Sequence, residues 1–593
     1  MSASAALNRL TYSRTESVMG LGESSGKAAK QQVIITSKRR NLLEWIVVIA
    51  LAGLAVALHL RFVTHAGGLW RDETNSINLA TLPTLAEVWH FLDYDSFPIL
   101  YFIVLRVWTT VFGVGNDVAL RALGLLIGLG ILGALWANAR AFRCRLPLLS
   151  FALVGVNPMI VRYGDSNRAY GLGILLILLT LRSFWRLVEP PVAPRGGQIA
   201  VAAILALLSV QCLYYNSILL FAIAAGAVAV ALRTRAWRTV AIVLGIGVLA
   251  AVSLLPYVPM FIRMRDWTFL VSYPCNFGWL WRRAGEVLGS PRPGVIWVWV
   301  GLVVVGLGVA IAAGTQSILR RRGSGDLESL HLPKDLPAVV LFSAIVLAIG
   351  VLGYAGFLRT LNYYTQPWYY ITLAVLVAST LDAVFGGWWN TEQPVVSLLV
   401  RSLRLIVAIS LLGFTAIPSW KEMPKRQTNV DLVAAQIEAL SRQGDVIVVP
   451  RWECAIPFCR YYRGPAQIVT IPPLEDHRFH RYDLLLAQMK TTDASAPVLA
   501  RMGEALRSGH RVFLADMLPF PTREVELPAL WPPYQDRRGV WHTAPYFQVW
   551  TMQAGRFLRA HARRGREIEV PLPIGTQVQG FEELNPGVLE GWH

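Results

Sequence analysis

The sequence predicts a polytopic α-helical membrane protein that carries a soluble α/β domain at its C-terminal end. Three observations lead to this fold class. The 593 residues are 54% hydrophobic and only 16% charged, whereas an average soluble protein is ~25% charged. Apolar runs of 16 to 22 residues recur between residues 41 and 417, close to the length that crosses a hydrocarbon core. After Pro418 the composition becomes that of a water-soluble chain.

The distribution of basic residues also fits a membrane protein. The chain has 55 Lys and Arg against 37 Asp and Glu, a formal net charge of +18, which in a soluble protein would suggest nucleic-acid binding. Much of this excess lies in short loops between apolar runs, where Lys and Arg orient the chain and meet anionic head groups. The sequence contains no zinc-type cysteine spacing, P-loop or dinucleotide fingerprint. We therefore expect membrane lipids, and no nucleic acid, among its partners.

Clusters of basic residues predict the path of the chain across the bilayer. Lys38, Arg39 and Arg40 place a polar N-terminal tail, residues 1–40, in the cytoplasm, and the apolar run that follows is long enough to be an uncleaved anchor. Further cytoplasmic loops are marked by the arginines at 140–145, 233–238 and 320–322. Segment 97–112 is short and carries Arg106, so we expect it to lie in the outer interface.

Eleven crossings and an external C-terminus follow, within a total of about 11–13 membrane helices. The predicted spans are about 42–62, 118–138, 147–162, 169–187, 198–213, 216–232, 238–256, 294–314, 337–357, 367–385 and 396–416. The loop near 388–394 should be cytoplasmic although it has no Lys or Arg.

The chain thus divides into the tail, a transmembrane domain at 41–417 with external loops 64–117 and 257–293, and an external domain at 418–593. Helix-like stretches at 431–442 and 495–507 alternate with short strands at 446–449, 468–471 and 511–515, which predicts an α/β domain with a partly parallel sheet. Residues 546–550 are expected to add an edge strand. Cys454 and Cys459 lie in this domain, where a disulfide and two buried free thiols are equally compatible with the spacing.

Four polar segments each follow an outward span: Trp70–Glu73, Arg162–Arg168, Tyr214–Asn216 and Arg359–Tyr364. Ionisable groups at membrane depth are costly and usually belong to a functional site. A single acidic pair after a span is more often solvated loop, but acids and arginines recur here at several outer helix ends. This recurrence favours a site at the external face.

The first of these segments resembles a known family signature. Trp70-Arg71-Asp72-Glu73 looks like the Asp-Glu motif of the GT-C glycosyltransferases, in particular the group of protein O-mannosyltransferases, aminoarabinose transferases and rhizobial galacturonosyltransferases. The stretch 95–101, then Phe112-Gly113 and Leu120-Arg121, is similar to that family's His-Pro-Pro-Leu-Tyr-Tyr stretch, Phe-Gly turn and Leu-Arg. Ser96-Phe97 stands where the family has His-Pro. Segment 162–170 resembles the one that carries the family's second acidic residue.

This resemblance implies a polyprenyl-phosphate sugar donor whose sugar passes to an acceptor hydroxyl of a lipid, glycan or protein, at the external face of a bacterial inner membrane. A phosphate leaves readily without protonation, so one base for the acceptor is enough, unlike in glycosidases. By carry-over from the family motif, Asp72 is the candidate general base, with Glu73 orienting the acceptor or the base. Asp165 is the second carboxylate, with pairing to Arg162 or Arg168 as an equally weighted alternative.

Candidate donor contacts complete the predicted site. Arg71, Arg168 and Arg359 are assigned to the donor phosphate, because guanidinium groups match phosphate oxygens and stay charged. Ser96 lies in the loop that the resemblance assigns to donor contact, and Tyr214 and Tyr363 line the sugar pocket or belong to an interfacial aromatic belt. A divalent metal ion held by Asp72 and Asp165, and neutralisation by the arginines alone, are both open.

Two further questions stay open at this point. In the external domain Trp452, Glu453, His477 and His480 are the polar candidates, and a structural or surface role is favoured for each. A transporter or flippase that moves a lipid-linked sugar without chemistry is the main rival function, and a polysaccharide ligase with a diphosphate-linked donor is a third. A transporter would place ionisable groups near mid-membrane and show two related halves, neither of which is visible here.

Overall fold

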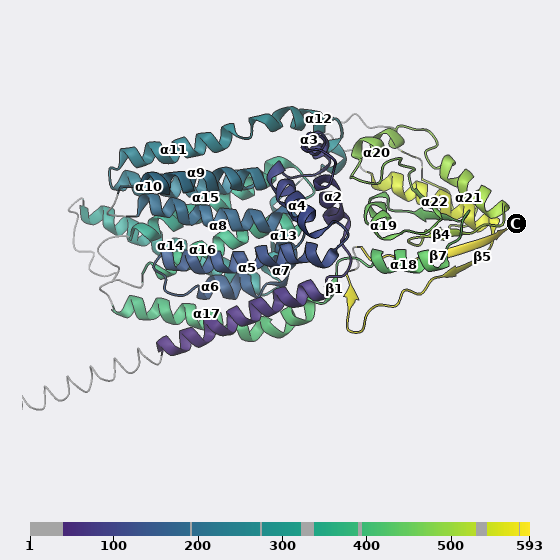
Figure 1. The fold of residues 1–593 in the computed structure, drawn as a ribbon. Coiled ribbons are helices and arrows are strands. Elements are labelled where there is room, and N and C mark those ends of the chain that lie inside the picture. The colour runs from purple at the N-terminus through teal and green to yellow at the C-terminus, as the bar shows by residue number, and fades with distance from the viewer. Residues whose placement is uncertain are drawn as a thin grey trace, which may run out of the picture.

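The computed structural model describes residues 40–189, 193–272, 275–321, 337–388, 394–528, 530, 543–579 and 582–593. A bundle of helices forms one end of the molecule and the C-terminal α/β domain forms the other (Figure 1). Three sequence-based predictions fall outside the described residues, namely the tail at 1–39 with Lys38 and Arg39, the basic residue Arg322, and the loop at 389–393.

Within the described part of the chain, nine helices are long and apolar enough to cross a membrane. This confirms the predicted class of polytopic helical membrane protein. The nine are Arg40–His65, α5 (Asp117–Ala141), α8 (Ala169–Val188), α10 (Asn216–Arg233), Trp237–Val271, Val295–Gln316 in α14 (Val295–Arg321), α15 (Ala338–Leu361), Pro367–Gly386, and Val395–Glu422 in α17 (Pro394–Glu422). The orientation of these helices across the bilayer stays a prediction.

The count of nine differs from the predicted eleven at two segments. Helix α9 (Gly196–Cys212) has 17 residues, a length at the lower limit for a span. The predicted span at 147–162 is broken into α6 (Leu148–Ser150), a π-helical turn (Phe151–Gly155) and α7 (Pro158–Gly164). Asn157 caps α7 by accepting hydrogen bonds from two backbone N–H groups, and its amide donates to the Val287 carbonyl at 2.8 Å. The break lies inside the protein, where irregular backbone at membrane depth is tolerated.

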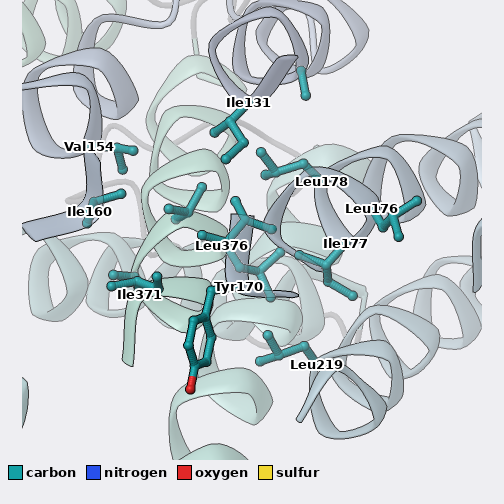
Figure 2. Close-up of a cluster of buried hydrophobic side chains, with 14 of the residues drawn as sticks. Ile131, Val154, Ile160, Tyr170, Leu176, Ile177, Leu178, Leu219, Ile371 and Leu376 are labelled. Carbon is teal, nitrogen blue, oxygen red and sulfur yellow. The ribbon is translucent and has the colours of Figure 1, made fainter. Parts of the chain in front are cut away.

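The core of the membrane domain lies around α16 (Ile371–Gly386), which follows a 3₁₀ turn (Pro367–Tyr370). In the segment Pro367–Gly386, 94% of the apolar stretch that is long enough to cross a membrane is buried inside the protein. Figure 2 shows Leu376 of α16 in the middle of the cluster, together with Ile177 and Leu178 of α8 and with Ile131 of α5 nearby. Ile371 lies on the other side of the cluster, towards Ile160. Most side chains of α16 and α8 are covered by other parts of the protein. These two helices therefore form the centre of the membrane domain, and the loops at their ends are attached to it.

Two ion pairs tie the outer helices of the bundle to this core. Arg404 of α17 donates to Asp382 of α16 at 3.0 Å, and Asp382 also accepts from the Ser150 hydroxyl at 2.6 Å. Arg401 pairs with Glu44 at 2.9 Å, which joins the first span to α17, and these two helices run side by side in Figure 1. All four charged side chains are buried, so each needs its partner.

Short helices cover the end of the bundle that faces the α/β domain. After the first span come α2 (Arg71–Ala80), α3 (Leu85–His90), a 3₁₀ turn (Phe91–Tyr94) and α4 (Ile99–Phe112). Helix α4 has 14 residues, too few to cross a bilayer, and Arg106 within it donates to the Ala80 and Pro83 carbonyls after α2. The loop predicted at 257–293 contributes α12 (Val258–Thr268), a 3₁₀ turn (Phe269–Val271) and α13 (Phe277–Leu288).

The C-terminal domain contains a five-stranded sheet in the order β3-β2-β4-β7-β5. Strands β2 (Val446–Val449), β3 (Gln467–Thr470) and β4 (Val512–Leu514) are parallel, while β7 (Gly587–Trp592) and β5 (Ala562–Glu567) are antiparallel to their neighbours. The partly parallel α/β domain is thereby confirmed. Its helices are α18 (Val430–Leu440), α19 (Ala455–Tyr461), α20 (Tyr482–Met489), α21 (Ala496–Arg507) and α22 (Ala544–His561), and a small parallel pair joins β1 (Lys425–Arg426) to β6 (Gln577–Val578).

One element of this domain was wrongly predicted. The expected edge strand at 546–550 lies inside α22, where Tyr546, Val549 and Trp550 are buried. Their i, i+3 and i+4 spacing places them on one helical face, and a short aromatic run did not reveal this period. Cys454 and Cys459 are both free thiols in the structure.

Candidate functional site

A cavity of about 480 Å³ lies between the membrane domain and the C-terminal domain. Five of the predicted site residues line it, from three distant parts of the sequence: Arg71, Asp72, Ser96, Arg168 and Tyr363. Four others do not, namely Glu73, Asp165, Tyr214 and Arg359. The cavity therefore gathers the first predicted acid and two of the three predicted arginines.

Asp72 lies in the first turn of α2, whose N-terminus opens at the cavity. Trp70 is the N-cap residue, and its backbone N–H donates to Glu73 at 3.3 Å. Acids in a first helical turn are stabilised by the helix dipole. Asp72 Oδ1 lies 3.4 Å from Arg71 Nε and 3.7 Å from His480 Nε2, and no donor among the described residues makes a hydrogen bond to this carboxylate. Its oxygens are thus open to a ligand.

Glu73 is completely buried and serves a different purpose. Its carboxylate accepts from Arg121 at 2.5 Å and from the backbone N–H of Asn167 at 2.8 Å. These contacts fasten α2 to α5 and to the loop before α8. Glu73 was predicted to orient either the acceptor or the base. It does not line the cavity, and its contacts fix the helix that carries Asp72.

Arg168 and Asp95 form the second charged cluster on the cavity wall. Arg168 Nη1 donates to Asp95 at 2.8 Å, to the Ser76 hydroxyl at 2.7 Å and to the Asp72 carbonyl at 2.9 Å. Asp95 also accepts from Asn75 at 3.0 Å and from the Ser96 N–H at 2.7 Å. Asp95 is thus saturated, unlike Asp72. All these Arg168 bonds run through Nη1. Among the described residues no acceptor engages its Nη2, which is therefore available to a ligand.

Arg71 connects the two domains at the rim of the cavity. Its guanidinium lies 3.1 Å from Glu453 and 3.0 Å from Glu582, both of which belong to the C-terminal domain. Burial, opposed by Arg71 and assisted by Asp72, raises the pKa of Glu582 to about 7.

Asp165 lies outside the cavity, contrary to its predicted place beside Asp72. Its Oδ2 is 2.6 Å from His59 Nδ1 in the first span, and it is fully buried. Gly128 of α5 makes room for this pair, because a Cβ there would lie 2.1 Å from Asp165 Oδ1 and 2.6 Å from His59 Nδ1. The sequence offers Arg162 and Arg168 as partners for Asp165. The observed partner is His59, which lies 106 residues earlier in the chain.

The remaining predicted residues pack elsewhere. Arg359 is exposed in the last turn of α15 and lies 3.5 Å from Asn362. Tyr214 contacts the rings of Tyr257 and Phe261 with centroids 5.5 and 5.1 Å away. Arg263 of α12 makes a bidentate contact with the cavity residue Asp93. Its Nε and Nη2 donate to the two carboxylate oxygens, each at 2.9 Å.

Several cavity residues were missed or undervalued in the sequence. Trp452, Glu453 and His480 of the C-terminal domain line the cavity, whereas His477 does not. Asp95 stood within a family-like stretch without receiving a role. The position of Asp95 within that motif could have indicated a role. No sequence pattern predicts the contact between segment 478–480 and α2.

A metal site at Asp72 and Asp165 does not fit this geometry. Asp165 is engaged with His59 away from the cavity. Among the residues that the structure describes, no group of three or more His, Cys, Asp or Glu side chains is placed to hold a metal ion. The cations that face the cavity are guanidinium groups.

Fold and cavity together define an integral membrane protein whose helical domain and α/β domain share one polar cavity. No protein-family model matches the chain, and no curated protein matches it in sequence. Solved structures similar to it include ArnT from Cupriavidus metallidurans and the oligosaccharyltransferase from Archaeoglobus fulgidus.

The measures of similarity are modest. Apo ArnT has a TM-score of 0.47 and 14% identity, covering 78% of this chain and 91% of that chain, and ArnT bound to undecaprenyl phosphate has 0.42 and 14%, covering 79% and 93%. The oligosaccharyltransferase in complex with Zn and sulfate has 0.44 and 11%, covering 79% and 68%. These values are too low to assign the residue roles or substrates of those proteins to this chain.

Proposed function

We propose that this protein transfers a sugar from a polyprenyl-phosphate donor to an acceptor hydroxyl at the external face of the membrane, with Asp72 as general base. One observation carries the proposal. Asp72 is a cavity carboxylate to which no donor among the described residues makes a hydrogen bond. Arg71 Nε lies 3.4 Å from its Oδ1, and Arg168 donates to its backbone carbonyl at 2.9 Å.

The proposed step needs one base and a stabilised leaving group. The acceptor oxygen attacks the anomeric carbon and gives its proton to Asp72 as the new C–O bond forms. The bond from that carbon to the phosphate oxygen breaks, and the electron pair leaves with the phosphate. Attack from the face opposite the phosphate inverts the anomeric centre. A positioned base typically contributes ~10²–10⁴-fold to such a rate.

Arg168 is the best placed partner for the phosphate. Its guanidinium lies 4.4 Å from the Phe97 ring, and Nη1 is anchored on Asp95, so Nη2 is held in one orientation. A planar guanidinium with one fixed edge suits a phosphate oxygen. Arg71 is engaged by Glu453 and Glu582, and its contribution depends on those two acids.

Aromatic side chains on the cavity wall provide a surface for a sugar. The rings of Tyr94, Trp267 and Tyr482 stack in sequence, with centroids 6.4 and 5.2 Å apart and planes within 16°. They come from the first external loop, the second external loop and the C-terminal domain. A second cavity of about 220 Å³ shares Gln366 and Trp368 with the first, which supports a reaction with two substrates.

The decisive experiment measures release of polyprenyl phosphate. Purified protein in detergent is given a panel of polyprenyl-phosphate hexoses and pentoses with a membrane lipid and glycan extract, and the products are followed by mass spectrometry. We expect polyprenyl phosphate and a glycosylated acceptor to appear together. A flippase would leave the donor intact, and a ligase would require a diphosphate-linked donor.

The matched variants are Asp72→Asn and Asp493→Asn, the latter an exposed acid of the C-terminal domain outside the cavity. We expect Asp72→Asn to lose at least a hundredfold in kcat while it still binds undecaprenyl phosphate. Asp493→Asn should behave as wild type. Near-normal turnover in Asp72→Asn would remove Asp72 from the mechanism.

A further inference from the structure

The segment 478–480 of the C-terminal domain docks on the face of α2 that carries Asp72. Asn75 accepts a hydrogen bond from the His480 N–H at 3.0 Å, and Asn78 donates to the Arg478 carbonyl at 2.9 Å. Positions 72, 75 and 78 follow each other at intervals of three and share one helical face. The two asparagines therefore fix the backbone of His480 beside Asp72.

Phe479 anchors this segment in the membrane domain. Its side chain is fully buried within the hydrophobic core of the membrane domain, where it stacks on Phe91 with centroids 5.3 Å apart and planes at 28°. A residue of the C-terminal domain thus belongs to the core of the other domain. Burial of this apolar ring stabilises the docked position of the segment.

The imidazole of His480 is aimed at Asp72. His480 Nε2 lies 3.7 Å from Asp72 Oδ1, and this buried nitrogen has no hydrogen-bond partner among the described residues. The rings of Trp452 and Tyr482 meet the imidazole edge to face, each with centroids 6.2 Å away. These rings restrict its rotation.

Burial, together with Arg71 and Arg168 and against Asp95, lowers the pKa of His480 to about 3. With this pKa the contact at neutral pH is one between an uncharged imidazole and the Asp72 carboxylate. A neutral imidazole offers one N–H, and the tautomer is set by the partner that this N–H finds.

We propose that His480 is a positioning residue for Asp72, with its Nε2–H donating to Asp72 Oδ1 when substrate closes the 3.7 Å gap. Asp72 Oδ2 is then left to accept the proton of the acceptor hydroxyl. This inference rests on the proposed function of Asp72. Catalytic hydrogen bonds are often long in unliganded structures and shorten in the substrate complex, and a base that is itself oriented by a third group is a recurring arrangement.

The test compares two amides that differ in reach. The amide nitrogen of His480→Gln stands near the position of Nε2, while that of His480→Asn is too short to reach Asp72. We expect His480→Asn to lose about 10- to 100-fold in kcat, as for a hydrogen bond to a charged group, with the donor KM little changed. His480→Gln should recover most of the rate. His477→Gln, three residues away and outside the cavity, is the control.

The dependence of kcat/KM on pH separates positioning from a structural role. Without the donated hydrogen bond, the Asp72 carboxylate is less stabilised, so the acid limb of the profile should move to higher pH by about one unit in His480→Asn and return in His480→Gln. The other charged or titratable groups around the pair are Arg71, Asp95, Tyr163, Arg168, Tyr170, Tyr363, Tyr369, Glu453, Tyr482 and Glu582. Equal losses in the Gln and Asn variants, or an unmoved acid limb, would overturn the proposal.

A second measurement does not depend on turnover. Nitrogen NMR of histidine-labelled protein, with His480 assigned by its loss in His480→Gln, should show a neutral ring with the proton on Nε2 at pH 5. The signal should change in Asp72→Asn. A charged ring at pH 5, or a proton on Nδ1, contradicts the positioning role. If Asp72→Asn is inactive while the His480 variants are normal, only this inference fails and the proposed function stands.

Discussion

Adjacent acidic residues have opposite roles in this protein. Asp72 faces the cavity with oxygens open to a ligand, whereas Glu73 is enclosed and bonded to Arg121 and to the backbone of Asn167. A helix turns by about 100° per residue, so neighbouring side chains point in different directions. The Asp-Glu pair therefore has one member that faces the cavity and one that is buried in the structure.

This division predicts opposite effects of two similar substitutions. Glu73→Gln leaves the buried Arg121 guanidinium without its counter-charge, and breaking a buried pair typically costs roughly 3–5 kcal/mol. We expect a clear fall in the unfolding temperature in detergent for Glu73→Gln and little change for Asp72→Asn. The double variant Glu73→Gln/Arg121→Met should recover part of the loss. A Glu73→Gln protein as stable as wild type would contradict this assignment.

At the scale of elements, the junction between α2 and the C-terminal domain depends on Arg71 and its two acids. The folded protein holds the pKa of Glu582 at about 7, above the usual value for Glu. Between the unfolded and folded pKa, the folded state binds more protons than the unfolded state. This group therefore favours folding at low pH, and its contribution decreases as the pH rises towards 7.

Glu582→Gln tests this pH dependence. Gln cannot ionise, so the wild type should lose stability relative to the variant as the pH rises from 5 to 8, at up to about 1.4 kcal/mol for each unit of pKa difference. Unfolding temperatures across this range provide the measurement. Glu526→Gln, an exposed acid of the same domain outside the cavity, is the control. A constant difference between wild type and Glu582→Gln at every pH would refute the raised pKa.

Sequence patterns located the elements better than their contacts. Apolar runs predicted each of the nine candidate membrane helices, because burial in lipid needs long apolar runs. They predicted two spans too many, one where Asn157 and Pro158 interrupt the run and one at α9, which has 17 residues. Asp72 and Arg168 were found from motif and charge. The partner of Asp165 and the place of His480 depend on tertiary packing between segments far apart in the chain, which no local pattern records.

At the scale of the whole molecule, the cavity belongs to neither domain alone. Its lining includes Asp72, Arg168 and Tyr363 from the membrane domain and Glu453 and His480 from the C-terminal domain. The aromatic stack likewise crosses the junction. The C-terminal domain is thus part of the site and not an attachment to it.

Removal of residues 420–593 should therefore abolish transfer even if the membrane domain inserts. We expect the truncated protein to lose at least a hundredfold in kcat, because the walls around Asp72 and the docked segment are gone. Binding of undecaprenyl phosphate, measured separately by native mass spectrometry, reports whether the membrane domain is intact. Turnover close to that of the full chain would show that the second domain is dispensable.

The bond between Arg71 and Glu582 also has a consequence for biosynthesis. Arg71 lies in α2 and Glu582 in the C-terminal domain, so the ribosome makes Arg71 long before the acid with which it pairs. The cavity wall between the two domains is complete only after residue 582 has been translated. Under the proposed function, a chain interrupted before that point should not transfer sugar.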